Sequence, residues 1–344
     1  MNQRPRLASL IFEVTQRCNH TCLHCYNVWQ GEPVPSYPRG ELDTAQTLVL
    51  LGKALDESEC RHVTLTGGEP LLRPDLNLLL DHLRARNVMV TIISNGRFLT
   101  PERITSLLER KVALFELPLL SHQRETHDRL SGAPEAWDAV LSALAHLRLQ
   151  HGQVVTAFVA TRLNIAHLHE TIKLAFAFGA RGIMLNRFNP GGRGRLHLQE
   201  LLPSVDQVRE ALCIAESASQ EYGIPISCSI PIQPCLIDTS AFPHVSFGFC
   251  AAGTERAYYT LDPLGNIRPC NHSTTILGNL LTESFSDILA KEELCTFTAS
   301  LPAYCIHCEQ RALCQGGCKA SAQVCYGSLT ELEPFLRQAV PVAR

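Results

Sequence analysis

The sequence predicts an α/β protein, in which a partial (β/α)6 TIM-like barrel is followed by a small cysteine-rich α+β domain. Two observations predict this class. Between residues 7 and 190, apolar β-branched runs alternate six times with segments of helical periodicity, which is typical of parallel βα units. After residue 223 this alternation stops, and eight of the 15 cysteines of the chain fall between Cys250 and Cys325.

The predicted elements follow in order along the chain. Short apolar runs predict strands at 7–15, 61–67, 88–94, 112–120, 154–162 and 182–188. Apolar residues at helical spacing predict helices at 44–57, 76–86, 101–111, 136–150, 166–180 and 205–223. The third helix has a clear start, because Pro101 suits the first helical position and Thr100 suits the N-cap.

The domain boundaries follow from the same pattern. We expect a barrel core at 1–200, a linker helix at 201–224, a cysteine-rich domain at 225–335 that includes a hairpin at 258–270, and a C-terminal tail at 336–344. The glycine-rich stretch 187–194, RFNPGGRG, breaks the barrel pattern. It favours a flexible connection, with a substrate entrance as the alternative.

The composition excludes several classes of function. The 344 residues carry a formal net charge of −3, which gives no basis for binding nucleic acid or an anionic membrane. No apolar run is long enough to cross a bilayer, and no signal peptide is recognisable at the N-terminus. We therefore expect a soluble, cytoplasmic protein. In that compartment the cysteines are unlikely to form disulfides.

Three cysteines lie close together directly after the first predicted strand. Cys18, Cys22 and Cys25 form a C-x3-C-x2-C motif at the mouth of the barrel, where TIM-like folds place their active sites. Thiolates are the usual ligands of iron–sulfur clusters, and three of them leave one iron of a four-iron cube without a protein ligand. A zinc site completed by His20 or His24 is the alternative that this motif alone leaves open.

The motif and its position resemble the radical S-adenosylmethionine (SAM) superfamily. The resemblance implies that Cys18, Cys22 and Cys25 are catalytic cluster ligands and that the amino and carboxylate groups of SAM bind the fourth iron. The cluster would then cleave SAM reductively to a 5′-deoxyadenosyl radical, which removes hydrogen from the substrate. It also implies SAM contacts at the ends of strands two and three and on a stretch at 126–132. The residues concerned are Thr66, Gly67, Gly68, Glu69, Pro70, Ser94, Asn95 and Arg129.

Two of these positions need comment. A surface ion pair is an equally good interpretation of Arg129. On the fourth strand, Pro118 and Leu120 stand where many relatives have serine and aspartate, so a SAM contact from this strand is in doubt.

The C-terminal cysteines resemble the SPASM extension of radical SAM enzymes. Its spacing, C-x9–15-G-x4-C, then C-x2-C-x5-C-x3-C and a final C, is matched at all seven cysteine positions. The resemblance implies two auxiliary four-iron clusters, and hence three four-iron clusters in total. The first would be bound by Cys250, Cys270 and Cys318, with Cys235 as the candidate fourth ligand, Cys228 as the alternative, and an open iron if neither reaches. The second would be bound by Cys305, Cys308, Cys314 and Cys325.

The resemblance implies an oxidoreductase, and the leading interpretation is one that oxidises or crosslinks a ribosomally made peptide or protein. Radical modification of a small molecule, such as a tetrapyrrole side chain or an aminoglycoside, is the alternative, and a non-catalytic iron–sulfur sensor or electron carrier is the alternative of a different class. Sulfatase maturation is disfavoured, because Asn271 follows Cys270 where those relatives have an aspartate base. The expected partners are the substrate, an electron donor such as flavodoxin or ferredoxin, and a separate peptide-recognition protein, since the first strand begins by about residue 7.

Overall fold

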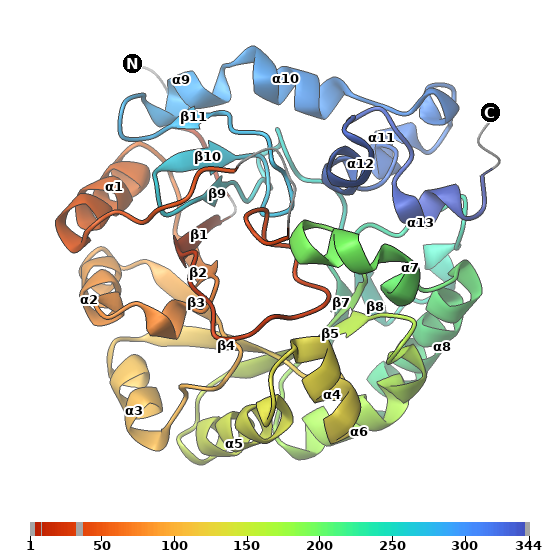
Figure 1. The fold of residues 1–344 in the computed structure, drawn as a ribbon, viewed down its shortest axis with the longest axis horizontal. Coiled ribbons are helices and arrows are strands. Elements are labelled where there is room, and N and C mark those ends of the chain that lie inside the picture. The colour runs from red at the N-terminus through yellow and green to blue at the C-terminus, as the bar shows by residue number, and fades with distance from the viewer. Residues whose placement is uncertain (1–3, 8, 32–36, 341–344) are drawn as a thin grey trace.

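The computed structural model describes residues 4–7, 9–31 and 37–340. Within these residues the strands form one continuous sheet, in the order β11-β10-β9-β1-β2-β3-β4-β5-β6-β7-β8. The strands from β1 to β8 run parallel to their neighbours. Figure 1 shows the sheet curving into a partial barrel with helices on its outer side.

The six predicted barrel strands are all present, and two short ones extend them. The first six are β1 (Leu10–Thr15), β2 (His62–Gly67), β3 (Met89–Ile93), β4 (Val112–Pro118), β5 (Val154–Ala160) and β6 (Ile183–Arg187). The two added strands are β7 (Ile226–Cys228) and β8 (Val245–Phe247).

The helices that cover the outside of the barrel bury one apolar face each. They are α1 (Thr44–Asp56), α2 (Leu76–Ala85), α3 (Pro101–Glu109), α5 (Ala136–Leu149), α6 (Leu168–Ala177) and α8 (Val205–Tyr222). Two short helices, α4 (Arg124–Ser131) and α7 (Leu198–Leu201), lie nearer the barrel mouth (Figure 1). The predicted cap of α3 is confirmed, since the Thr100 side chain accepts a hydrogen bond from the amide of Arg103. Helix α8 begins with a capping box of Ser204 and Gln207 and ends at Gly223 in the left-handed conformation.

The cysteine-rich region joins the same sheet. Its predicted hairpin is β9 (Thr260–Leu261) with β10 (Asn266–Arg268), and β11 (Gly278–Asn279) pairs with β10. Strand β9 lies parallel to β1, so the hairpin continues the barrel sheet beyond its first strand. The helices of this region are α9 (Phe285–Leu289), α10 (Glu292–Ala299), α11 (Arg311–Cys314), α12 (Lys319–Tyr326) and α13 (Pro334–Arg337).

Two buried ion pairs tie the cysteine-rich region to the barrel. Arg268 on β10 pairs with Glu13 on β1, and both side chains are buried. Arg187 at the end of β6 pairs with Glu333, which comes just before α13; the shortest distance is 2.7 Å and the two side chains are 1% and 0% exposed. Because unpaired charges are costly in a protein interior, each pair fixes the relative position of its two segments.

Candidate functional site

The loop that carries Cys18, Cys22 and Cys25 lies at the carboxyl end of β1, at the mouth of the barrel (Figure 1). Burial raises the pKa of the Cys22 thiol, and the charges of Cys25 and Cys18 raise it further. Burial likewise raises the pKa of Cys25 to about 11. These thiols act on one another and favour their protonated form, so thiolates at this position need a positively charged partner such as a metal cluster.

The contacts of the two histidines in this loop disfavour a zinc site completed by either of them. Among the described residues, no three His, Cys, Asp or Glu side chains are arranged to hold one metal ion. His20 and His24, the proposed zinc ligands, both lie near His127 of α4 and act on its pKa. His24 also makes a hydrogen bond to the backbone of Leu130, at the end of the same helix. The three cysteines therefore remain as a three-ligand set, which is the arrangement that a cluster with one open iron requires.

Glycines at the end of β2 bring this strand against the cysteine loop. A Cβ atom on Gly68 would lie 2.0 Å from the carbonyl oxygen of Arg17, and one on Gly67 would lie 2.3 Å from that of Thr15. The amide of Glu69 donates to the Arg17 carbonyl at 2.8 Å, and the Asn27 side chain donates to the Gly67 carbonyl at 2.6 Å. The two glycines are thus needed for close backbone packing as well as for the predicted SAM contact.

Glu69 connects most of the predicted SAM-binding positions. Its carboxylate accepts hydrogen bonds from the Ser94 hydroxyl at 2.9 Å, the Asn95 amide at 2.8 Å and the Leu71 amide at 3.0 Å. The side chain is buried, and burial raises its pKa to about 7. Asn95 in turn donates to the side chain of Asn19 in the cysteine loop at 2.8 Å. The ends of β2 and β3 and the cysteine loop therefore form one hydrogen-bonded unit, in which Thr66 and Pro70 are also buried.

Arg129 lies at the edge of this unit, on α4. Its guanidinium pairs with Glu200 of α7 at 2.6 Å, and its side chain is 60% exposed. This is the surface ion pair that the sequence left open, and the structure places no further predicted residue against it. On β4, Pro118 ends the strand and Leu120 just beyond is buried. The same strand carries Glu116, whose pKa is raised to about 7 by burial and whose charge acts on the pKa of Tyr26 in the cysteine loop.

The loop after β6 is a part of the site that the sequence did not identify. The amide of Gly194 donates to the carbonyl of Cys25 at 2.9 Å, and a Cβ atom on Gly192 would lie 2.2 Å from the carbonyl of Asn27. The loop is therefore packed on the cysteine loop, and the expected flexible connection is wrong. Its Asn189 reaches the other way and donates to the sulfur of Cys318 at 3.3 Å.

Arg193 in this loop supplies positive charge to the three-cysteine set. Burial dominates the pKa of each of the three thiols, and Arg193 lowers that pKa in every case. One terminal nitrogen of Arg193 donates to the Gln30 side chain at 3.2 Å, and its Nε is buried without a hydrogen-bond partner in the structure. A cation with an unused donor beside three thiols is suited to hold an anionic group there.

Cys250, Cys270 and Cys318 of the first predicted auxiliary set line one hollow. Aromatic residues Phe249, Tyr258 and Phe297 line it as well. The hollow borders the N-terminal site, because His272, which also lines it, stacks on Tyr26, the residue after Cys25, with ring centroids 4.4 Å apart. The three thiols fit a cluster, and their position places it next to the three-cysteine loop.

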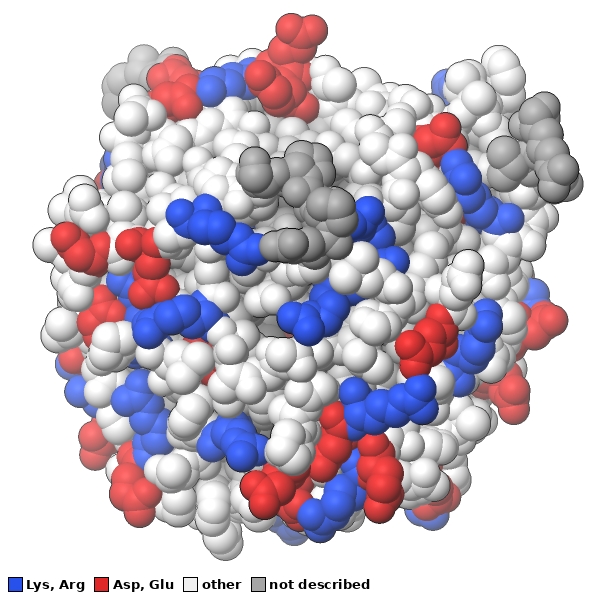
Figure 2. Space-filling view, viewed as in Figure 1, with Lys and Arg blue, Asp and Glu red and all other residues white. Residues whose placement is uncertain are grey.

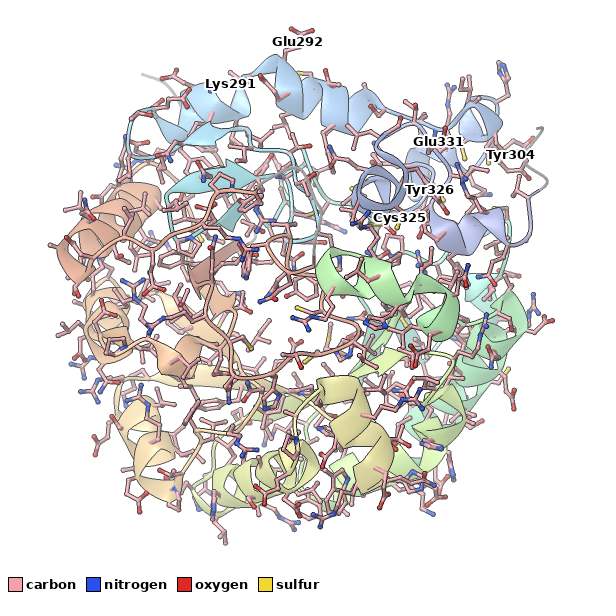
Figure 3. The ribbon with its side chains drawn as sticks, in the orientation of Figure 1. Lys291, Glu292, Tyr304, Cys325, Tyr326 and Glu331 are labelled. Carbon is pink, nitrogen blue, oxygen red and sulfur yellow. The ribbon has the colours of Figure 1, made fainter. Side chains whose placement is uncertain are left out.

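Cys235 lies close to three cysteines of the second predicted set. Burial raises the pKa of Cys305 most, and the charges of Cys314, Cys235 and Cys308 raise it further. These four thiols are therefore neighbours. Cys228, the other candidate for the first set, is buried in a separate hollow beside Arg187 and Val208. Cys325 lies on α12, and Figure 3 shows it apart from Tyr304, the residue that precedes Cys305.

The face at the barrel mouth has an uneven charge. Figure 2 shows Lys and Arg side chains gathered around the middle of this face, with acidic side chains mostly toward the rim. Arg17 and Arg97 are among the basic residues of the mouth, and both have acidic partners, Glu41 and Glu135. None of the helices in the described part of the chain has the length and apolar character of a membrane span.

Comparison with known proteins identifies the two regions. Residues 12–175 match the model of the radical SAM superfamily, and residues 250–315 match the SPASM model, an iron–sulfur cluster-binding domain. Among curated proteins, an AdoMet-dependent heme synthase of Methanosarcina barkeri is 26% identical, and the match covers 97% of each chain. A PqqA peptide cyclase of Gluconobacter oxydans is 25% identical over 95% of this chain and 89% of its own. The mycofactocin maturase MftC of Mycobacterium tuberculosis is 28% identical over 91% of this chain and 78% of its own.

Solved structures show the same fold at low sequence identity. SuiB of Streptococcus suis bound to S-adenosylmethionine superposes with a TM-score of 0.73 at 15% identity, over 97% of this chain and 77% of its own. The enzyme anSMEcpe with bound AdoMet gives a TM-score of 0.73 at 18% identity, over 96% of this chain and 90% of its own.

Proposed function

The chain belongs to the radical SAM superfamily and carries a C-terminal SPASM domain, and from this membership we propose that it oxidises or crosslinks a ribosomally made peptide. In this superfamily the reduced cluster cleaves SAM to methionine and a 5′-deoxyadenosyl radical, which removes a hydrogen atom from the substrate. Cys18, Cys22 and Cys25 are the proposed ligands of that cluster. The backbone at Gly67 and Gly68, with Glu69, Ser94 and Asn95, is proposed to hold SAM over it.

One observation carries the proposal: the SAM-cluster loop is in contact with residues that surround the first auxiliary set. Tyr26 of the loop stacks on His272, and the loop after β6 contacts Cys25 at one end and Cys318 at the other. A cluster held in this hollow would lie next to the SAM-cluster loop and close to a substrate bound there. This placement suits an oxidation in which hydrogen is removed on one side and an electron leaves on the other.

The relatives favour a peptide as the substrate. PqqA peptide cyclase and mycofactocin maturase are both named for maturation reactions, and SuiB has been solved bound to its precursor peptide SuiA. We propose a flavodoxin or ferredoxin as electron donor, three four-iron clusters per chain, and a separate protein that presents the peptide.

Modification of a tetrapyrrole is the second candidate. The heme synthase relative matches over 97% of both chains, a larger share of its own length than either peptide-modifying relative. The basic middle of the barrel-mouth face also suits the carboxylates of such a substrate (Figure 2).

A substrate comparison tests the proposal. Reconstituted, dithionite-reduced protein is incubated anaerobically with SAM and either a peptide encoded beside its gene or an iron-free or iron-bound tetrapyrrole carboxylate. We expect 5′-deoxyadenosine above the substrate-free level, together with a peptide product lighter by a whole number of hydrogens. A mass change in the tetrapyrrole but not in the peptide would identify tetrapyrrole modification, the second candidate, as the function. Absence of 5′-deoxyadenosine with intact clusters would leave a sensor or electron carrier.

We predict that Arg193→Gln weakens SAM binding by about 10- to 100-fold. The variant removes a cation that lies beside all three thiols and has an unused donor, and a hydrogen bond to a charged group contributes about 1.5–3 kcal/mol. Anaerobic calorimetry with SAM measures the change. Arg181→Gln, at an exposed position before β6, is the matched control and should bind SAM normally. Equal affinities of Arg193→Gln and the unaltered protein would show that Arg193 does not contribute to the SAM site.

A further inference from the structure

The segment after β7 packs on the loop that carries the last cysteines. The side chain of Gln233 donates to Glu333, which also accepts from the amide of Cys318 at 2.9 Å. A Cβ atom on Gly317 would lie 2.3 Å from the Gln233 side-chain nitrogen, so the two segments are in close contact. Leu236 packs into the small apolar cluster that contains Cys305. Cys235 lies between Gln233 and Leu236 in the chain. The packing of Leu236 places it near Cys305, and the described lining of the first hollow does not include it.

The thiols themselves show the same grouping. The charge of Cys308 raises the pKa of Cys235, and the charge of Cys235 raises the pKa of both Cys305 and Cys314. Cys305, Cys308 and Cys314 come from one stretch with short turns, in which the amide of Cys308 donates to the carbonyl of Cys305 at 3.2 Å. Four thiols from two segments thus converge at one place.

Cys325 lies in different surroundings. It is near the end of α12, where the charges of Arg195, Glu333 and Arg337 act on its pKa; Glu333 acts on the pKa of Cys314 as well. The next residue, Tyr326, lies under the guanidinium of Arg337 at 3.6 Å. In Figure 3, Cys325 and Tyr326 lie together beside α12 and apart from Tyr304. These contacts hold the Cys325 thiol in its place on α12.

The first hollow has three cysteines in its described lining. Its neighbours from the segment after β7 are Ser229, Ile230 and Pro231, and neither Cys228 nor Cys235 takes part. Cys228 points into the packed core beside Arg187 and Leu212. The described residues that line this hollow therefore supply three cysteines, the same number as the loop of Cys18, Cys22 and Cys25.

We propose that Cys235, together with Cys305, Cys308 and Cys314, binds the second auxiliary cluster, and that Cys250, Cys270 and Cys318 alone bind the first. This proposal rests on the proposed function, since it assumes that both auxiliary clusters are present. It makes Cys325 a non-ligand, and it leaves one iron of the first cluster without a protein ligand, so that a substrate thiolate or carboxylate can bind it.

The test compares two cysteine variants in a protein that lacks the SAM cluster. In the background Cys18→Ala, Cys22→Ala and Cys25→Ala, iron analysis and Mössbauer spectra report the auxiliary clusters alone, with about eight irons per chain expected. We expect Cys235→Ala to lose about four irons or to convert one cluster to a three-iron form, and Cys235→Ser to keep the iron with a changed spectrum. Cys325→Ala is the matched control and should keep both the iron content and the spectrum.

The outcomes separate this proposal from the proposed function. Loss of a cluster in Cys325→Ala, with Cys235→Ala unchanged, overturns the ligand assignment and leaves the function standing. A spectrum with two fully thiolate-coordinated clusters overturns the open iron of the first set. An iron content near zero in the background variant, with all variants folded by circular dichroism, would instead remove the auxiliary clusters and with them the basis of the proposed function.

Discussion

Gly68→Ala is expected to lower the rate of SAM cleavage by about 100-fold while leaving the auxiliary clusters in place. A Cβ atom at this position would lie 2.0 Å from the carbonyl oxygen and 2.4 Å from the carbonyl carbon of Arg17, and 3.1 Å from the amide nitrogen of Cys18. These are backbone atoms that no rotamer change can move, so the alanine must displace the cysteine loop itself. A displacement of about 1 Å at a reacting centre is enough to lower a rate by roughly 100-fold.

The measurement is 5′-deoxyadenosine formed per minute by the reconstituted variant, with iron content recorded in parallel. Gly52→Ala is the matched control, because Gly52 is also buried but its nearest neighbour is the end of the flexible Arg86 side chain at 3.3 Å, and alanine favours its helix. Activity of Gly68→Ala within a few-fold of that control would show that this close contact is not required for the SAM site.

Glu333→Ala is expected to lower the free energy of unfolding by about 3–5 kcal/mol, because it leaves the buried Arg187 charge without its partner. Glu333 accepts two hydrogen bonds from Arg187, at 2.7 and 2.9 Å, and one from the amide of Cys318. Arg187 also lies over the ring of Phe335 at 4.6 Å, so the pair connects β6, the Cys318 loop and α13. We expect the first auxiliary cluster to be lost more easily in this variant.

Anaerobic urea unfolding followed by circular dichroism measures the stability. The double variant Arg187→Met with Glu333→Leu removes both charges and should recover part of the loss, since an apolar pair of similar volume can replace a buried ion pair. A change below about 1 kcal/mol in Glu333→Ala would be the value expected for an exposed pair and would contradict this account.

The sequence predicted the elements whose periodicity is strong and local. The strand expected at 88–94 is Met89–Ile93, and the helix expected at 101–111 is Pro101–Glu109. It did not predict β7 and β8, because three-residue strands carry too little alternation to stand out and form here by pairing with β6. The cysteine motifs were recognisable because their spacing is fixed by the metal chemistry.

The parts of the site that the sequence missed depend on tertiary contacts. Glycines in the loop after β6 predict a flexible segment when read locally, but the missing side chains are what let Gly192 and Gly194 approach the cysteine loop. The grouping that we propose for Cys235 could not be predicted from the sequence for a related reason. Spacing along the chain cannot show which of two cysteine groups a distant segment will pack against, and here the contacts of Gln233 and Leu236 decide it.

The central claim is that one iron of the cluster at Cys18, Cys22 and Cys25 is left for SAM. Electron–nuclear double resonance on the reduced, reconstituted protein, with SAM carrying ¹⁷O in its carboxylate and ¹⁵N in its amino group, measures this directly. The account predicts hyperfine coupling to both labels in the unaltered protein and none in Cys22→Ala. A cluster signal in the unaltered protein that shows no coupling to either label would contradict it.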